Sequence, residues 1–277
     1  MKTTAIARNT FSEAIHQPIV YIIAGLGVTL LLLSFAFTLF TFSEENTARM
    51  IRDMGLATIT LCALLAALFT SSSVIADEIE KKTALTVLCK PVTRLQFLMG
   101  KYLGIILLVA CMIAALMTVF VIALVFLGPK ADIGAEKTVL PIGSHLWFVK
   151  HKPDFILCEA GLFAFLQVAM LTAISVAIST RFPLVVNVSA CFLIYVAGHA
   201  NTYIVAMAQE KGRLLCTCAQ IFATIFPNLE NLNVAALAAK GIAISISCLA
   251  LGALYAVLYV VAVLALALIA LERRELM

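Results

Sequence analysis

Residues 102–129 read YLGIILLVACMIAALMTVFVIALVFLGP, a run of 28 residues without a single Asp, Glu, Lys or Arg. An α-helix rises 1.5 Å per residue, so about 20 such residues cross a hydrocarbon core of about 30 Å. A membrane-spanning β-strand would instead interleave polar residues. The run therefore predicts a transmembrane helix.

Five further charge-free runs of similar length occupy most of the remaining chain. Overall, 63% of the residues are hydrophobic and 12% are charged, whereas soluble domains are about 45–50% apolar and about 25% charged. This composition excludes a soluble globular protein. We predict an all-α integral membrane protein with one transmembrane domain over residues 1–277. Its six expected spans are residues 18–43, 54–76, 102–129, 160–180, 182–209 and 241–271.

The basic residues indicate an orientation. An even number of spans places both termini on one side of the membrane. That side then carries ten of the 19 Lys and Arg residues, although its loops are shorter in total than those of the other side. Basic residues in short loops resist translocation. Both termini are therefore expected in the cytoplasm, with the chain in the cell membrane, or in the inner membrane if the source is Gram-negative.

Residues 1–17 have the periodicity of a helix that lies in the membrane interface. The apolar stripe consists of Ala5, Ile6, Phe11, Ala14 and Ile15, opposite Arg8, Asn9, Ser12 and Glu13. The alternative is a polar leader with chance periodicity. Pro18 suits the first turn of the helix that follows.

Residues 214–229, LLCTCAQIFATIFPNL, form an uncharged run of 16 residues that is too short to span. Pro227 and Asn228 end it. We predict a re-entrant segment that dips into the outer side of the membrane before the last span and buries its irregular backbone against protein.

No residue pattern indicates catalysis, a metal site or nucleic-acid binding. The eight cysteines and four histidines lack the spacing of metal ligands, although Cys158, Cys216 and Cys218 could pair near the outer face. The spans contain no ionisable Asp, Glu, Lys or Arg that could couple transport to an ion gradient. Energy for transport would have to come from outside the chain.

The uncharged polar residues of the spans have two interpretations. Gln167, Asn187 and the cluster 70–73, which includes Ser72, could line a pathway for a solute. Alternatively, they could hold the helices together by hydrogen bonds.

The loop 77–101 reads DEIEKKTALTVLCKPVTRLQFLMGK and carries eight charged residues between two spans. A helix is predicted up to Leu88, because Pro91 cannot continue it. Arg94 is expected to open a second short helix that leads into the third span. A polar, helix-forming loop held close to the membrane surface has the properties of a docking platform for a partner protein.

Ten positions follow a pattern of the form E-x-E-x-G-T, a leucine-rich turn, P-x-x-R and G-K-x-x-G. They are Glu78, Glu80, Thr83, Leu85, Leu88, Pro91, Arg94, Gly100, Lys101 and Gly104. Lys82 stands where the pattern has its first glycine. In this pattern the chain resembles the permease subunits of ABC transporters of the type 2 exporter family.

The resemblance implies a dimer, formed with a second copy or a related paralogue. Two separate ATPase subunits, which bind ATP and magnesium, would dock on the loop and the N-terminal helix. The chain itself would bind no cofactor and catalyse no reaction. The second and fifth spans would line the exit route, which makes Ser72 and Asn187 candidate pathway residues.

Two other functions remain as alternatives. A membrane anchor or assembly subunit that moves no solute would use the same docking loop. An ion-coupled carrier is disfavoured by the charge-free spans.

Overall fold

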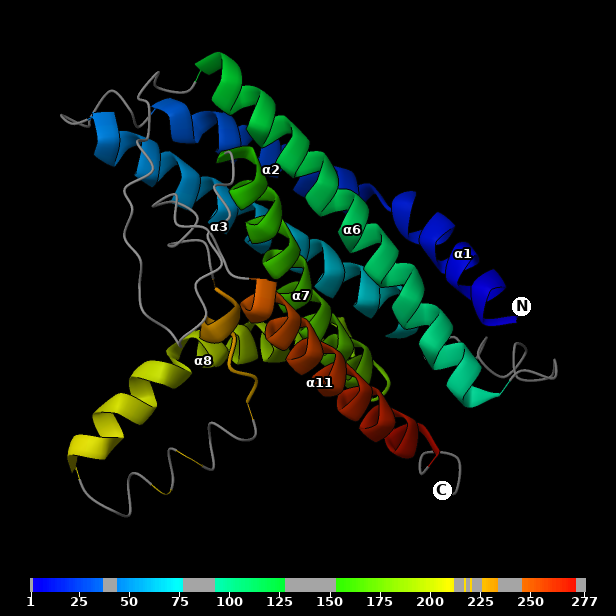
Figure 1. The fold of residues 1–277 in the computed structure, drawn as a ribbon. Coiled ribbons are helices and arrows are strands. Elements are labelled where there is room, and N and C mark those ends of the chain that lie inside the picture. Colours follow the sequence, from blue (N-terminus) through cyan, green and yellow to red (C-terminus); the bar gives the residue numbers. More distant parts are fainter. Residues whose placement is uncertain are drawn as a thin grey trace.

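The computed structural model describes residues 2–36, 44–76, 93–127, 153–211, 217, 220, 226–233 and 246–272. Within these ranges every regular element is a helix (Figure 1). Six of the helices are long and apolar enough to cross a membrane. The chain is an all-α, multi-pass membrane protein with six candidate spans.

The six candidate spans lie in α2, α3, α6, α7, α8 and α11. In chain order the helices are α1 (Lys2–Ile15), α2 (Pro18–Ala36), α3 (Glu44–Ser71), the π-helix η2 (Ser72–Ala76), α6 (Arg94–Leu127), α7 (Pro153–Ser179), α8 (Leu184–Lys211), the 3-10 helix η3 (Glu230–Leu232) and α11 (Ile246–Glu272).

The helices α3 and α7 begin at Glu44 and Pro153, before the predicted spans 54–76 and 160–180. One predicted element was wrong. Arg94 does not open a separate short helix, because α6 continues from it to Leu127 without a break. The first charged residue marks the edge of the hydrocarbon core, whereas helical hydrogen bonding continues into water. Residues 37–43 and 241–245 of the predicted spans lie outside the described residues.

Local sequence explains where several helices start. Pro18 and Pro153 occupy the first positions of α2 and α7, where a missing N–H has no helical partner to lose. At the start of α6, Gln96 N donates to Thr93 Oγ1 over 3.3 Å, and Thr93 N donates to Gln96 Oε1 over 3.4 Å. This reciprocal capping box satisfies N–H groups that the first turn leaves unpaired.

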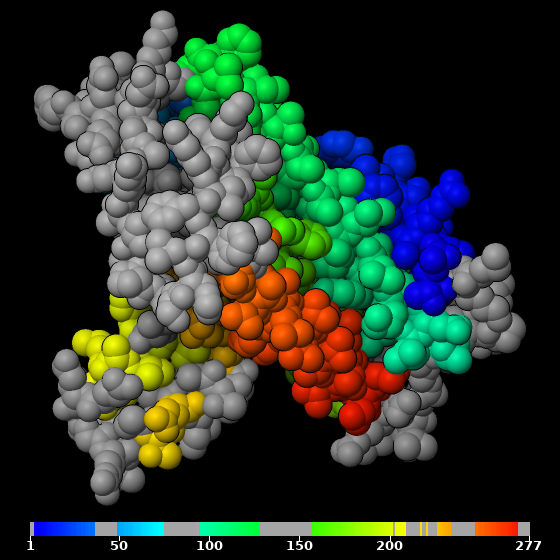
Figure 2. All heavy atoms as spheres, in the orientation of Figure 1, coloured from blue at the N-terminus to red at the C-terminus, as the bar shows by residue number. Residues whose placement is uncertain are grey.

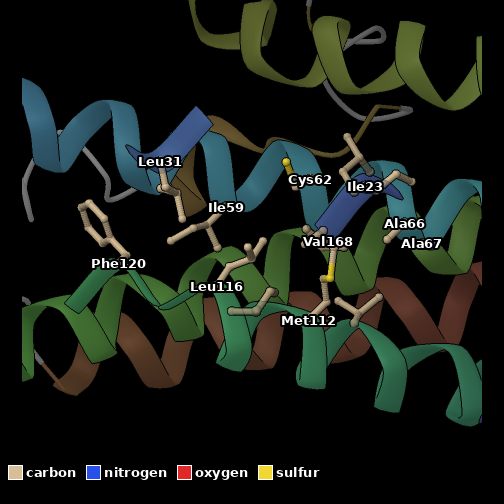
Figure 3. Packing of buried hydrophobic residues seen from close by; sticks show 14 of the residues in the cluster. Ile23, Leu31, Ile59, Cys62, Ala66, Ala67, Met112, Leu116, Phe120 and Val168 are labelled. Carbon is tan, nitrogen blue, oxygen red and sulfur yellow. The ribbon is translucent and has the colours of Figure 1, made fainter. Parts of the chain in front are cut away.

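The core of the bundle lies where α3 and α7 pack against α2 and α6 (Figure 3). Alanines such as Ala66 and Ala67 line α3, and Leu116 and Phe120 of α6 reach towards it. A methyl group at Gly55 would lie only 2.3 Å from the Phe120 ring. Small side chains thus let the helices approach closely, as membrane helix interfaces require.

The outer helices leave large apolar faces exposed. Side chains such as Leu193 on α8 and Leu258 on α11 are more than half exposed. α8 diverges from the bundle, and α11 forms part of the molecular surface (Figures 1 and 2). In a membrane protein such faces meet lipid or another subunit.

The N-terminal helix α1 packs along the first part of α6 (Figure 1). A Cβ atom added at Gly100 would lie 2.7 Å from the Ile6 side chain, and one at Gly104 would lie 2.6 Å from Thr10 Cβ. The two glycines are four residues apart and therefore share one face of α6. They form a groove into which α1 fits.

Packing against α6 covers most of the predicted apolar stripe of α1. Ala14 is fully buried and Ile6, Phe11 and Ile15 are partly buried, whereas Ala5 is exposed. Thr10 is fully buried instead. The contact face of α1 was determined by the shape of α6, because two glycines accept a threonine at close range.

Replacing Gly104 by alanine should separate α1 from α6. Overpacking of this kind costs about 1–3 kcal/mol, even though alanine is favoured over glycine in a helix by about 1 kcal/mol. Thermal unfolding in detergent should show a destabilised Gly104→Ala variant, and hydrogen exchange should increase in α1.

Gly25 provides the control, because no atom lies within 4 Å of a Cβ added there. The Gly25→Ala variant should be as stable as the parent or slightly more so. Equal behaviour of the two variants would contradict the close α1–α6 contact.

Candidate functional site

The predicted docking loop, residues 77–101, is described only from Thr93 onward. Its residues Glu78, Glu80, Thr83, Leu85, Leu88 and Pro91 lie outside the described residues, and so do Cys216 and Cys218. The described chain stops at Ala76, the end of η2, and resumes at Thr93, the cap of α6. We call residues 72–76 the α3 root of the loop and residues 93–104 the α6 root.

At the α6 root, Lys101 is almost completely buried. Its side chain is 3% exposed, and its Nζ lies 3.9 Å from Glu13 Oε2 of α1 and 5.7 Å from the centroid of the Phe97 ring. A buried ammonium group needs such partners, because the interior solvates charge poorly. Glu13 is 45% exposed, so water screens part of the attraction.

Three of the predicted docking residues therefore lie on α6, and two of them contact α1. Arg94 is the first residue of the helix, Gly100 receives Ile6, and Lys101 faces Glu13. The sequence contains a signal for this contact in addition to the docking pattern. Glycines separated by three residues are typical of membrane helices that pack closely.

At the α3 root, α3 changes into the π-helix η2. Serine hydroxyls compete with the backbone for hydrogen bonds, and π-helices are frequent at functional sites. The Ser73 hydroxyl lies 3.2 Å from the carbonyl of Thr70 and 3.0 Å from Gln17 Oε1. Gln17 lies between α1 and α2, so this root is also attached to the end of α1.

The two candidate pathway residues lie in direct contact. Asn187 Nδ2 of α8 donates to Ser72 Oγ over 2.6 Å and to Ser175 Oγ of α7 over 2.9 Å. Cys191 Sγ donates to Asn187 Oδ1 over 3.4 Å. Ser72 and Asn187 are both fully buried. We call Gln17, Ser72, Ser73, Ser175 and Asn187 the polar junction.

The junction has the character of a contact between helices in this conformation. Its hydrogen bonds join η2, α7 and α8 rather than facing an open channel. Gln17 and Ser175 are members of the junction that were not predicted from the sequence. No local pattern distinguishes them from other uncharged polar residues in or beside the spans.

Two hydroxyls beside the junction have no hydrogen-bond partner within the described part of the chain. Thr70 Oγ1 and Ser71 Oγ are fully buried and unpaired. An unpaired buried polar group is unfavourable and in a native structure needs an explanation. Thr70 and Ser71 thus place two further hydroxyl groups beside Ser72 that are not engaged in a described hydrogen bond.

A second polar contact joins α7 and α8. Gln167 Nε2 lies 3.0 Å from His199 Nε2, and His199 Nδ1 lies 3.1 Å from the carbonyl of Tyr195. A carbonyl only accepts hydrogen bonds. Nδ1 of His199 therefore carries the proton, and Nε2 accepts from the Gln167 amide.

The end of the predicted re-entrant segment packs among three helices. Leu229 N donates to the Gly198 carbonyl of α8 over 3.3 Å, and Asn228 N donates to Tyr255 Oη of α11 over 3.1 Å. Leu229 is fully buried. Gly198 lies within the candidate span 184–201, so Leu229 lies beside that span. Most of the segment before Phe226 lies outside the described residues.

Replacing Asn187 by leucine should destabilise the bundle. Leucine has a similar size but cannot bond to Ser72 or Ser175, and hydrogen bonds between membrane helices contribute about 0.6–1.7 kcal/mol each. Unfolding in a denaturing detergent should show a loss of about 1–2 kcal/mol for Asn187→Leu.

Asn201 is the matched control on the same helix. It is 1% exposed, and neither atom of its amide has a hydrogen-bond partner in the ranges that the structure describes. Removing an unpaired polar group should leave stability unchanged or raise it. If Asn201→Leu were as destabilising as Asn187→Leu, loss of packing rather than hydrogen bonding would explain both.

The described residues offer no metal centre. Within them, no group of three or more His, Cys, Asp and Glu side chains is placed to hold an ion, and Cys62, Cys111, Cys158, Cys191 and Cys248 are free thiols. The polar junction and the two roots of the loop are thus the candidate functional site. Among known proteins, no family model matches the chain, and no curated protein matches its sequence.

Proposed function

We propose that the chain is the membrane-spanning permease subunit of an ATP-driven ABC exporter of the type 2 family. A separate ATPase subunit would bind ATP and magnesium and dock on residues 77–101. The permease would act as a dimer, with a second copy or a related paralogue, in the cell membrane with both termini in the cytoplasm. No bound cofactor, nucleic acid or enzymatic activity is part of the proposal.

One observation carries the proposal beyond the sequence pattern: both roots of the loop are attached to α1. The α6 root contacts α1 through Gly100, Lys101 and Gly104. The α3 root packs near α1 and bonds through Ser73 to Gln17, in the turn between α1 and α2. A force applied to the loop would therefore move the ends of α3 and α6 together with α1, rather than bend the loop alone.

The polar junction supplies a route from the loop to the rest of the bundle. Ser72 lies five residues before Asp77, where the loop begins, and its hydroxyl accepts a bond from Asn187. Movement of η2 would break or exchange this bond and release α8 from α3. The unpaired hydroxyls of Thr70 and Ser71 would offer new partners.

The surroundings of Ser72 and Asn187 fit two states of one pathway. With the junction closed, both side chains are buried and bonded to each other. With the junction open, the same amide and hydroxyl groups would face the space between α3 and α8. The absence of Asp, Glu, Lys and Arg from the six charge-free runs of the sequence agrees with energy supplied by an external ATPase.

A subunit that anchors an ATPase without moving a solute would also have a buried junction. The two functions differ in what happens after docking. An anchor would bind the ATPase whether or not the junction can open, whereas a permease would lose coupling when the junction or its attachment is altered.

Charge reversal in the loop tests docking. Glu80→Lys and Arg94→Glu should weaken copurification of the ATPase, because mismatched charges across an interface cost several kcal/mol. The candidate partner is a P-loop ATPase that a neighbouring reading frame is expected to encode. ATP turnover of the complex in liposomes should fall in parallel.

Glu230→Lys serves as the control, because Glu230 begins η3 in the segment between α8 and α11, on the other side of the membrane in the predicted topology. It should leave binding and turnover unchanged. Full partner binding and full transport by both loop variants would show that the loop is a solvated connector, and the proposal would be wrong.

Removing the amide of Gln17 tests coupling separately from docking. The Gln17→Ala variant removes the acceptor of the Ser73 hydroxyl but leaves the loop and its charges intact. The ATPase should copurify at the parental level, while stimulation of its turnover by the permease should fall severalfold.

Thr29→Ala is the matched control, since the Thr29 hydroxyl bonds only within its own helix in the described contacts, to the Gly25 carbonyl. Its turnover should equal that of the parent. A Gln17→Ala complex with parental stimulation would remove α1 from the coupling route.

A further inference from the structure

A groove between α7, α8 and α11 remains outside the proposed coupling route. Its volume is about 370 Å³, within the range of about 300–1,000 Å³ typical of small-molecule sites. Among the described residues that line it, Arg181 is the one with a charged side chain. The remaining lining is almost entirely apolar, so the groove combines a long hydrocarbon surface with one cation.

Small residues create the space. α11 lines the groove from Tyr259 to Ala270 along one face, a length of about 16 Å at 1.5 Å per residue. Ala267 and Ala270 of this face and Ala177 of α7 leave room that larger side chains would fill. The groove is therefore long and narrow and lies along helices that are candidate spans.

The end of the groove away from Arg181 is lined by the segment that packs between α8 and α11. Phe226 and Pro227 both line it, and Pro227 is buried. The Pro227 carbonyl lies close to Gly198, and Leu229 N donates a hydrogen bond to the Gly198 carbonyl. A ligand that enters from the Arg181 end would meet this segment at the depth of the spans.

The opposite end lies at the level of the membrane interface. Arg181 stands in the turn between the candidate spans 157–179 and 184–201, and its side chain is exposed. Its Nη2 atom donates to the Ala270 carbonyl over 3.1 Å, in the last turn of α11. A guanidinium group has five N–H donors, so this bond leaves most of them for another acceptor.

We propose that the groove binds one acyl chain of an anionic phospholipid from the leaflet on the side of the C-terminal end of α11. The phosphate would bind the guanidinium group of Arg181, for which planar, charge-assisted hydrogen bonds are favourable. The chain would lie along Ala177, Ala267 and Ala270 and end near Pro227. A water-soluble anion would not use the apolar length of the groove.

The charge of Arg181 and the depth of the groove along the spans together indicate a lipid as the ligand. An arginine at the interface attracts lipids with negative headgroups, and an apolar surface at the depth of the spans faces acyl chains. Bound there, the lipid would bridge α7, α8 and α11, of which α8 and α11 have only 22% of the residues of their candidate spans buried. This site does not depend on the proposed exporter function.

The test uses the full chain in nanodiscs and two photoactivatable lipids with identical acyl chains. One probe is phosphatidylglycerol and the other is phosphatidylcholine, each with a diazirine near the end of one chain. Cross-linked peptides are mapped and quantified by mass spectrometry. The phosphatidylglycerol probe should label the groove residues of α7, α8 or α11 severalfold more than the phosphatidylcholine probe.

Two variants separate the headgroup from the chain. Arg181→Gln should reduce labelling by phosphatidylglycerol to the level of phosphatidylcholine, whereas Arg181→Lys should keep part of the preference. Ala177→Leu fills the groove and should reduce labelling there by both probes. Arg8→Gln is the control, because Arg8 is an exposed cation of α1 that does not line this groove.

The outcomes are distinguishable. Equal labelling of the groove by both probes in the parent, or an unchanged preference in Arg181→Gln, would show that the lipid is not selected by its charge, and the proposal would be wrong. Labelling spread evenly over the exposed faces of α2, α8 and α11 would mean ordinary surrounding lipid. Size-exclusion profiles identical to that of the parent would show that Ala177→Leu is folded, and full groove labelling in that variant would also contradict the proposal.

Discussion

The amide of Asn187 is the interaction on which the arrangement of the inner helices depends. One side chain donates hydrogen bonds to Ser72 at the end of α3 and to Ser175 on α7, and it accepts one from Cys191 on its own helix. In lipid, the hydrophobic effect does not drive helices together, so packing and hydrogen bonds select their neighbours. A fully buried amide that lost these partners would remain unpaired, which makes the three-helix contact specific as well as stable.

The helix α1 gives this contact a connection to the loop 77–92. It fits against Gly100 and Gly104 of α6, places Glu13 near the buried Lys101, and ends where Gln17 accepts a bond from Ser73. The α3 root and the α6 root of the loop both contact this short helix. Cooperative movement of α3 and α6 therefore has a physical basis in close packing and two polar contacts.

The other half of the bundle is held together differently. There, Gln167 contacts His199, and residues 226–233 lie between α8 and α11 through the bonds of Leu229 and Asn228. Asn201 is buried nearby in α8 without a hydrogen-bond partner in the described ranges. The hydrogen bonds of the polar junction involve the α3 root, so a movement of the loop would reach them. The hydrogen bonds of the other half connect α8 to α7 and α11.

The sequence by itself determined the class of the protein and the existence of its six long helices. Charge-free runs of more than 20 residues can satisfy their backbone in a membrane only as helices, and this follows from composition along the chain. Sequence also placed Ser72, Asn187, Gly100 and Lys101 among the residues of interest. The residues of the loop from Glu78 to Pro91 stay a prediction.

Only the tertiary structure decided which residues meet. Ser72 and Asn187 are 115 positions apart, and nothing in either local sequence identifies the other as its partner. Gly100 and Lys101, which are predicted to belong to the docking loop, contact α1, and Ala5 of the predicted apolar stripe is exposed. The physical reason is that hydropathy is a sum over neighbouring residues, whereas helix pairing in a membrane depends on the shapes of small residues and on the direction of individual hydrogen bonds. Those quantities exist only once the helices are side by side.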